Sequence, residues 1–506
     1  MPPNFKALNP LKRLAGQTAI YGLSSIIGRL LNYLLVPLYT RVLVTSEYGI
    51  YTEMFAWVSI IWVLLTYGME TTFFRFSESE KDGERVYSTS LLSLFGTSAI
   101  FLFLILSNTG NIAEWLGYAD RTHYIVYFGF ILSLDAMSAI PFARLRQQNR
   151  PIKFATIKLI NIGINIGLNL FFVLLCPYIL NNYPNSELAG LIAKFFNPDD
   201  LVGYIFISLL VASVVTLILL IPEMQLKHYT FDLKIWKRML AYTWPLMIVA
   251  IAGSINLSLD KILLKMLLPG NSEAEIMAQV GIYGACYKVS IIMTLFIQTF
   301  RYAADPFFFA EAKKLESKQI YADVLKYFTI VAAMVFLLTT LYLDVVIRFI
   351  GMDYRAGRNV VPILLMGNLF LGIFYNLSFW YKLTNRTIFG ALFSVIGAGI
   401  TIALNIILIP TLGYYGSAWA AFVAYFVMMV LSYVMGRKYF PVPYQLPKII
   451  FYLLFSVAIY FISINLGFDE GIIKYLVNTF LLIVFLSFVL LIEKHSLRSL
   501  IKKNKT

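Results

Sequence analysis

Long apolar stretches follow one another along this chain, with only short polar breaks between them. Each is about 20 residues or longer, the length that an α-helix needs to cross the hydrocarbon core of a bilayer. The stretches are apolar on every helical face, whereas the strands of a membrane β-barrel would alternate polar and apolar positions over about 10 residues. The pattern therefore predicts an all-α protein that spans a membrane many times.

Fourteen membrane-spanning helices are predicted from these stretches, and the connections between them leave no room for a soluble domain. The predicted spans run from Ala15 to Tyr39, Tyr48 to Thr71, Tyr87 to Ser107, Tyr124 to Ala143, Phe154 to Leu180, Leu201 to Ile221, Met239 to Leu259, Gly281 to Tyr302, Tyr327 to Leu343, Val360 to Tyr381, Ile388 to Ile409, Tyr414 to Met435, Ile449 to Leu466 and Ile472 to Leu491.

The composition agrees with this class, because 59% of the residues are hydrophobic and only 13% are charged, unlike the usage of soluble domains. A net charge of +14 would suggest nucleic-acid binding in a soluble protein. Here the basic residues gather in loops and tails beside the predicted spans. We therefore expect membrane lipids, and no nucleic acid, among the partners.

The distribution of basic residues predicts the orientation of the helices. With a cytoplasmic N-terminus, roughly 29 of the 41 Lys and Arg residues fall in cytoplasmic loops and tails. The C-terminus is then predicted to be cytoplasmic as well. The positive-inside rule explains these charges, and contact with anionic lipid headgroups is a second explanation. The most basic loops hold Arg144, Arg146, Arg150 and Lys153, then Lys227, Lys234, Lys237 and Arg238, then Lys313, Lys314 and Lys318.

An internal repeat is visible when the chain is compared with itself at an offset of 236 residues. The alternative explanation is chance similarity between apolar helices, but the aligned loop residues are polar. The matching pairs are Asn149-Arg150-Pro151-Ile152 with Asn385-Arg386-Thr387-Ile388, Leu168-Asn169 with Leu404-Asn405 and, at a slightly shorter offset, Gly49-Ile50-Tyr51 with Gly281-Ile282-Tyr283.

Repeats separated by six helices have the same orientation, so a pseudo-two-fold axis along the membrane normal would relate two six-helix lobes. The expected lobes are residues 1–222 and 223–440, and residues 441–506 add two helices and a basic tail. Two such lobes leave a cleft between them that can open to either side when one lobe rocks against the other. This is the architecture of a transporter.

The sequence contains no phosphate-binding loop, no H-E-x-x-H zinc motif and no G-x-S-x-G nucleophile elbow. The three histidines, His123, His228 and His495, lie far apart in the sequence at predicted membrane edges. A metal site or a catalytic triad is therefore not expected. We predict a transporter that needs no cofactor, and not an enzyme.

Charged residues inside the predicted spans are the candidates for function, because each costs at least about 2.5 kcal/mol to insert. Arg29 lies near the middle of the first span, too deep for easy snorkelling, and its guanidinium can bind a phosphate through two hydrogen bonds. Its alternative role is an ion pair with Glu53 or Asp135. Those acids are in turn either counter-ions or sites for a coupling proton or sodium ion, and the counter-ion role is favoured.

Two lysines complete the candidate set. Lys288 lies two turns into the eighth span and Lys158 one turn into the fifth, and snorkelling to the membrane surface competes with substrate binding for both. Asp260 and Lys261 directly follow the predicted seventh span and are expected at the interface. Polar residues on one face of the fifth span are interpreted as contacts between helices; they are Asn161, Asn165 and Asn169.

Several stretches, taken in order and spacing, resemble the polysaccharide (O-antigen type, Wzx-like) flippases of bacteria. That superfamily also contains multidrug exporters and the lipid II flippase. The resemblance covers nearly the whole chain. It is carried by Arg29 to Leu43 with Tyr48-Gly49, Asp260-Lys261, Gly281-Ile282-Tyr283, Tyr287-Lys288, Ala304-Asp305-Pro306, Val361 to Leu364, and Leu404 to Pro410 with Gly413 and Gly416-Ser417-Ala418.

The resemblance implies alternating access for an undecaprenyl-pyrophosphate-linked oligosaccharide, carried from the cytoplasmic to the outer leaflet of the bacterial inner membrane. The product would serve O-antigen, capsule or exopolysaccharide synthesis, together with glycosyltransferases and a polymerase. Arg29 and Lys288 stand where a cationic cavity would receive the pyrophosphate, and Lys158 is a further candidate for substrate binding, although snorkelling is favoured there. The prenyl tail is expected to stay in lipid.

Two alternatives remain open. A cation-coupled exporter of drugs or metabolites could share the fold, although the arginine in the first span favours an anionic substrate. A membrane sugar transferase, ligase or polymerase would need catalytic acids or bases in a large outer loop, and the longest, Asn181 to Asp200, carries mainly Asn, Pro and a few charges.

Overall fold

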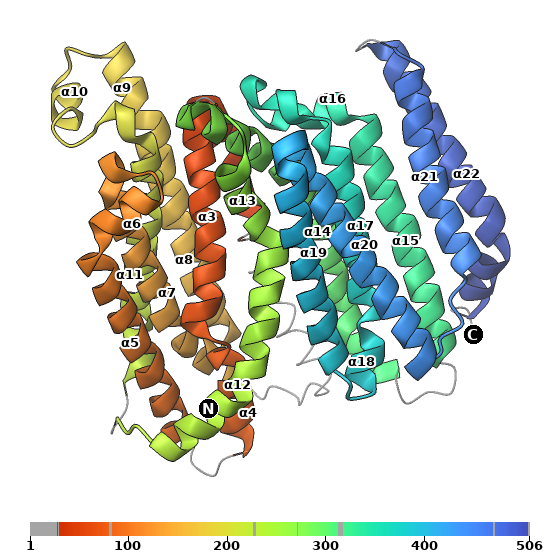
Figure 1. Ribbon diagram of the computed structural model, residues 1–506, viewed down its shortest axis with the longest axis horizontal. Helices are drawn as coiled ribbons and strands as arrows, with labels where there is room; N and C mark the ends of the chain where they lie inside the picture. The colour runs from red at the N-terminus through yellow and green to blue at the C-terminus, as the bar shows by residue number, and fades with distance from the viewer. Residues whose placement is uncertain are drawn as a thin grey trace, which may run out of the picture. The chain divides into compact units, whose positions relative to one another are not determined.

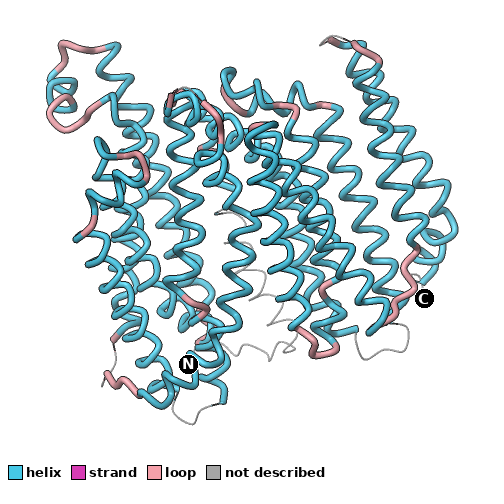
Figure 2. Tube along the Cα trace, in the orientation of Figure 1, coloured by secondary structure: helices cyan, strands magenta, loops and turns pink. Residues whose placement is uncertain are grey.

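The computed structural model describes residues 28, 30–79, 83–225, 229–270, 272–311, 317–468 and 471–503, and all regular structure within them is helical (Figure 2). Thirteen helical runs in these ranges are long and apolar enough to cross a membrane. The first predicted span, Ala15 to Tyr39, lies mostly outside the described residues. The prediction of an all-α, multi-pass membrane protein is confirmed, and thirteen observed runs agree with about fourteen helices.

Several runs join more than one helix, and short helices lie in some of the connections (Figure 1). In chain order the helices are α2 (Val36–Val42), α3 (Thr45–Thr66), α4 (Met69–Ser79), α5 (Gly83–Ser107), α6 (Thr109–Trp115), η1 (Ala119–Arg121), α7 (Thr122–Gln147), α8 (Pro151–Asn169), η2 (Leu170–Leu175), α9 (Cys176–Asn182), α10 (Glu187–Ile192), η3 (Pro198–Asp200), α11 (Leu201–Met224), α12 (Leu233–Ser254), η4 (Ile255–Leu259), α13 (Asp260–Leu267), α14 (Glu273–Glu311), α15 (Ser317–Leu341), α16 (Leu343–Val346), η5 (Ile347–Phe349), η6 (Met352–Gly357), α17 (Val360–Leu377), α18 (Phe379–Leu383), α19 (Ile388–Leu412), α20 (Tyr414–Tyr439), α21 (Leu446–Asn465) and α22 (Ile472–Lys503).

The chain divides into two compact units, one made of residues 1–266 and 270–281 and the other of residues 267–269 and 282–506. In the first unit α7 packs on α5 and α11, α11 packs on α8, and α12 packs on α3 and α4. In the second unit α20 packs on α17 and α19, and α15 packs on α17 and α21. The lobe boundaries and the pseudo-two-fold axis that the repeat suggests stay predictions.

The seventh predicted span is longer than expected. It does not end at Leu259 but continues through the π-helical turn η4 into α13. Asp260 and Lys261, expected at the interface, are instead buried inside the helical run, with exposed fractions of 3% and 8%. The Lys261 ammonium donates to Asp260 Oδ1 at 2.8 Å and to the Leu257 carbonyl at 3.1 Å. The two opposite charges thus neutralise each other, and the helix continues past them.

Glycines allow α3 and the start of α14 to touch backbone to backbone in the first unit. A Cβ atom on Gly49 would lie 2.0 Å from the Met277 carbonyl oxygen, and one on Gly281 would lie 2.0 Å from the Thr45 oxygen. Both distances are far below van der Waals contact. The glycines of the two repeated Gly-Ile-Tyr motifs therefore meet at this crossing.

We expect Gly49→Ala to lower the free energy of unfolding by about 1–3 kcal/mol, because the added methyl group must push two helix backbones apart. Gly163→Ala is the matched control: this glycine is also helical, but its Cβ would meet nothing within 4 Å. Thermal unfolding of both purified variants in detergent measures the difference. Equal stability of the two variants would contradict the close crossing.

Candidate functional site

The charged residues that the sequence analysis selected fall in both units. Glu53 lies in α3, Asp135 in α7 and Lys158 in α8, all in the first unit, whereas Lys288 lies in the part of α14 that belongs to the second. Arg29 lies outside the described residues. What the four described side chains contact inside their own unit decides which roles are open to them.

Glu53 is the most fully buried of the four, with an exposed fraction of 1%. Lys265 of α13 donates to Glu53 Oε2 at 3.0 Å, and the Trp57 indole donates to Oε1 at 3.2 Å. The Tyr118 hydroxyl donates to the same carboxylate. Glu53 thus has a cationic partner, Lys265, which the sequence analysis did not select because it lies beyond the predicted end of the seventh span.

Tyr118 closes this cluster from the connection before η1. Burial raises its pKa well above the usual value, and the neighbouring Glu53 carboxylate raises it further. The hydroxyl therefore stays protonated and acts as a donor. Lys265 Nζ also lies 4.0 Å from the centre of the Tyr118 ring and 3.6 Å from Glu273 Oε1. The cluster ties α3, α13 and the start of α14 together.

Asp135 of α7 and Lys158 of α8 lie half-buried on helices that pack on each other. The Lys158 ammonium is 4.2 Å from the centre of the Phe142 ring, a cation–π contact with α7. Lys158 is therefore held against α7. Like Glu53, Asp135 has a lysine in its surroundings.

The asparagines of α8 contact neighbouring helices, which confirms the interpretation made from their spacing. Asn161 Nδ2 donates to Thr216 Oγ1 of α11 at 2.8 Å. Asn165 Nδ2 donates to Asn32 Oδ1 at 3.3 Å, and the Tyr39 hydroxyl donates to Asn169 Oδ1 at 2.8 Å. These bonds fix residues 30–42 against α8, so they hold the helix that follows Arg29 in place.

A second carboxylate, Glu223 at the end of α11, organises the basic loop between α7 and α8. Arg150 Nη1 lies 3.0 Å from Glu223 Oε1 and 3.1 Å from Oε2, and Lys153 binds the same carboxylate. Arg144 and Tyr87 donate to the Glu223 main-chain oxygen at 2.7 and 2.9 Å. These basic residues, explained from the sequence by topology, also hold the loop together.

Replacing Glu223 by Gln is expected to lower the free energy of unfolding by about 1–3 kcal/mol, since charge-assisted hydrogen bonds to two cations are lost. Glu187→Gln is the control, because Glu187 is an exposed acid in the first turn of α10. Denaturant unfolding of the two variants in detergent compares them. An equal effect of both substitutions would show that the Glu223 cluster adds no stability.

In the second unit, α14 carries two cations inside its spanning part. Lys288 is half-buried. Arg301 lies 13 residues further on, about 20 Å along the helix axis, with its guanidinium carbon 4.2 Å from the centre of the Tyr375 ring of α17. The sequence analysis did not select Arg301, because it stands at the predicted end of the eighth span, where snorkelling would explain it.

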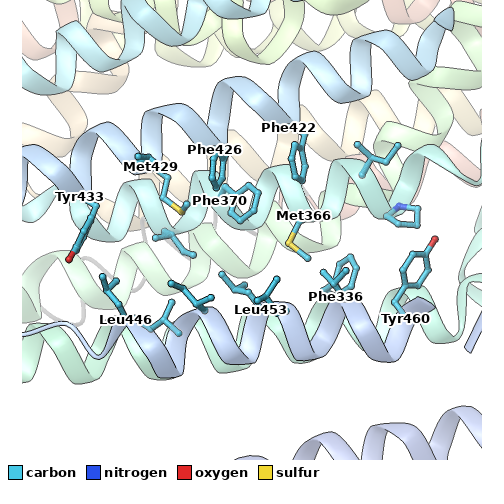
Figure 3. Close-up of a pocket in the computed structure, with 18 of the residues that line it drawn as sticks. Phe336, Met366, Phe370, Phe422, Phe426, Met429, Tyr433, Leu446, Leu453 and Tyr460 are labelled. Carbon is cyan, nitrogen blue, oxygen red and sulfur yellow. The ribbon is translucent and has the colours of Figure 1, made fainter. Parts of the chain in front are cut away.

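The second unit also contains an apolar cavity of about 820 Å³ between α21 and the helices α15, α17 and α20. In Figure 3 the side chains of α17 and α20 point toward those of α21, and Tyr433 and Tyr460 stand at opposite ends. The volume is in the range of small-molecule sites, but the lining has almost no polar groups to orient a sugar or an ion. It includes Phe336, Met366, Phe370, Phe422, Phe426, Met429, Leu446 and Leu453.

The buried carboxylates and the apolar cavity are the two features from which a site can be built in the described residues. No group of three or more His, Cys, Asp or Glu side chains in the described parts of the chain could hold a metal ion. The buried carboxylates of Glu53, Glu223 and Glu493 are each neutralised by lysine or arginine. The apolar cavity adds a space suited to a hydrocarbon chain.

Solved structures with the same fold are membrane transporters. The lipid II flippase MurJ, in an inward closed conformation, matches with a TM-score of 0.64 and 14% identity over 93% of this chain and 98% of that one. A multidrug resistance MATE family transporter of the MOP superfamily, in an inward-facing conformation, matches with a TM-score of 0.56 and 13% identity over 84% of this chain and 97% of that one. A mutant of the Vibrio cholerae MATE transporter VcmN matches with a TM-score of 0.53 and 13% identity over 84% of this chain and 96% of that one.

Comparison with curated proteins gives no significant sequence match. A family model does match, over residues 14–311, which is more than half of the chain, and its description is polysaccharide biosynthesis protein. With the multi-pass helical fold, this match shows that the chain belongs to the polysaccharide biosynthesis protein family, on the fold of the MOP-superfamily flippases and transporters.

Proposed function

We propose that this protein is a flippase that carries an undecaprenyl-pyrophosphate-linked oligosaccharide from the cytoplasmic to the outer leaflet of the bacterial inner membrane. The observation that carries the proposal is the family match, because polysaccharide biosynthesis needs its lipid-linked units moved across a membrane. The fold shared with a lipid II flippase supports it. Glycosyltransferases would supply the substrate, and a polymerase would consume the product for O-antigen, capsule or exopolysaccharide.

The pyrophosphate is the part of the substrate that needs charged partners in the membrane. Arg29, Lys288 and Lys158 are proposed to bind it, in a protein of two lobes, residues 1–222 and 223–440, with both termini cytoplasmic. A guanidinium binds two phosphate oxygens at once, which makes Arg29 the main contact. Rocking of the lobes would then expose the bound substrate to the outer side.

The apolar cavity of the second unit is proposed to receive part of the prenyl tail, so the tail need not stay wholly in lipid. Burial there gains no transfer free energy, because the bilayer is as apolar as the cavity wall. Close packing supplies the attraction. The fixed double bonds of an isoprenoid leave it fewer rotatable bonds per carbon than a saturated acyl chain has, so fewer rotations are lost when it is held. Residues at membrane depth such as Phe370 and Phe426 provide the contact surface.

A cation-coupled multidrug exporter is the second candidate, supported by the fold shared with MATE transporters. Such an exporter needs acids that hold cations or protons. In this chain Glu53 binds Lys265, and Asp135 lies on α7, which packs on the helix that carries Lys158. We therefore assign Glu53 the role of a counter-ion and propose the same role for Asp135, so the anionic substrate remains the better candidate.

A bacterial strain that lacks its own polysaccharide flippase tests the proposal in cells. Expression of this chain should restore surface polysaccharide when the glycan is compatible, and it should leave resistance to cationic drugs unchanged. Strains with several glycans are needed, because the identity of the glycan is not fixed by the fold. Raised drug resistance without surface polysaccharide in any strain would favour the exporter.

A further inference from the structure

The two C-terminal helices are the most lipid-exposed part of the second unit. Only 22% and 17% of the residues in the spanning parts of α21 and α22 are buried, against 89% in the run that contains α17. The helices lie side by side and pack on α15 (Figure 1). Since lipid is as apolar as their side chains, burial alone supplies little force to hold them there, and so few buried residues leave little van der Waals packing. Polar contacts therefore have a large share in fixing where this hairpin sits.

One end of the hairpin is fixed by Glu493 of α22, whose side chain is fully buried. Lys326 of α15 donates to Glu493 Oε2 at 2.7 Å. From α21, Lys448 donates to Oε1 at 2.9 Å and the Tyr452 hydroxyl donates to the same atom at 2.9 Å. A single carboxylate thus joins three helices, and we call these four residues the Glu493 cluster.

The other end is fixed by separate polar contacts. Lys474 of α22 lies 2.5 Å from Asp344 Oδ2 of α16. Asn478 Nδ2 donates to the Leu341 carbonyl oxygen of α15 at 2.6 Å. The hairpin is therefore tied to the α15–α16 segment at both ends.

The Glu493 cluster lies directly behind one end of the apolar cavity. Leu325, next to Lys326, lines the cavity, and so do Leu446 and Ile449 on either side of Lys448. Leu446 marks this end in Figure 3, near Tyr433. The residues that hold α21 at its distance from α17 and α20 are thus the neighbours of residues that form the cavity wall.

We propose that the Glu493 cluster positions α21 as the wall of a binding site for an isoprenoid chain, so that the width of the cavity depends on this buried carboxylate. The lipid part of this inference rests on the proposed function, because it takes the cavity as the place of the prenyl tail. Glu493 touches no substrate; it acts through the position of α21.

Two readouts in nanodiscs test the positioning role. Spin labels at positions 451 of α21 and 434 of α20, both exposed and neither in the cavity lining, report the spacing across the cavity. Undecaprenyl phosphate with a photoreactive group on its tail reports occupancy, through labelled peptides that contain Phe426. Glu493→Gln should broaden the spacing and lower the labelling about five-fold, the change that about 1 kcal/mol produces.

Variants on the same network separate positioning from stability. Lys448→Gln removes the ion pair to α21 and leaves the Tyr452 hydrogen bond in place, so it should give smaller changes in the same direction, and it serves if Glu493→Gln does not fold. Asp323→Asn is the matched control, because Asp323 also lies 3.4 Å from Lys326 but does not join the hairpin, and both readouts should stay unchanged.

The possible outcomes are distinct. Unchanged spacing and labelling in folded Glu493→Gln and Lys448→Gln would overturn the positioning role, even if both variants melt at a lower temperature. Spacing that changes in these variants, with no labelling of the wild-type cavity, would support the positioning role and overturn the place of the tail in the cavity. Changes in both readouts support the whole inference.

Discussion

Replacing Lys265 by Met is expected to lower the free energy of unfolding by about 3–5 kcal/mol, because the Glu53 carboxylate would remain buried without its cation. The side chain of Glu53 is only 2% exposed and that of Lys265 only 15%, so water cannot replace the lost partner. Met keeps the length and apolar stem of the lysine, which restricts the change to the charge. Reversible unfolding in mixed micelles measures the loss.

The double variant Glu53→Met with Lys265→Met separates the charge from the packing. Because it removes both members of the pair, it should recover most of the stability that the single variant loses. A double variant that is as unstable as Lys265→Met would mean that shape, and not an uncompensated charge, explains the loss. A single variant as stable as the wild type would contradict the ion pair itself.

The second large effect concerns transport. Arg29→Ala is expected to slow transfer of the lipid-linked oligosaccharide about 10- to 100-fold, because a charge-assisted contact contributes about 1.5–3 kcal/mol. Arg29→Lys should lie between the two, since an ammonium keeps the charge but loses the paired donors. The transfer rate in proteoliposomes with equal protein content is the measurement.

Arg41→Ala is the control for Arg29. It removes the same residue type from the next described helix, where the Arg41 side chain is exposed and its Nη1 donates to the Pro37 carbonyl at 2.9 Å. Its transfer rate should stay close to that of the wild type. If Arg29→Ala transports at the wild-type rate, the cationic site does not include this arginine.

The helices could be predicted from the sequence because a membrane forces every backbone polar group to be satisfied within its own segment. The third predicted span, Tyr87 to Ser107, ends at the same residue as α5. Length and hydropathy are properties of one stretch at a time, so no information from elsewhere in the chain was needed.

The ion pairs of Glu53 and Glu493 could not be predicted in the same way, because each joins residues that are distant in sequence. Glu53 and Lys265 are 212 positions apart, and Lys326 and Glu493 are 167 apart. Hydropathy treats each charge as a cost wherever it stands. It therefore pointed to Glu53 as a possible ion site, but it could not find the lysine that neutralises it.

Asp260 and Lys261 show why a predicted helix end can be wrong. Their charges lower the local hydropathy, so the predicted helix stops before them, although the apolar residues Ile262, Leu263 and Leu264 follow. Adjacent opposite charges that bind each other cost less than two separate charges, and the helix crosses them. A charge pair inside an otherwise apolar stretch is thus weaker evidence for a helix end than a single charge.

The measurement that tests the central claim most directly is transfer of a labelled undecaprenyl-pyrophosphate oligosaccharide across proteoliposomes that contain only this protein. If the protein is a flippase, label should reach the far leaflet faster than in protein-free liposomes, and Arg29→Ala should remove most of the difference. Wild-type transfer no faster than in protein-free liposomes, with a panel of glycans and with an imposed ion gradient, would contradict a flippase for lipid-linked sugars.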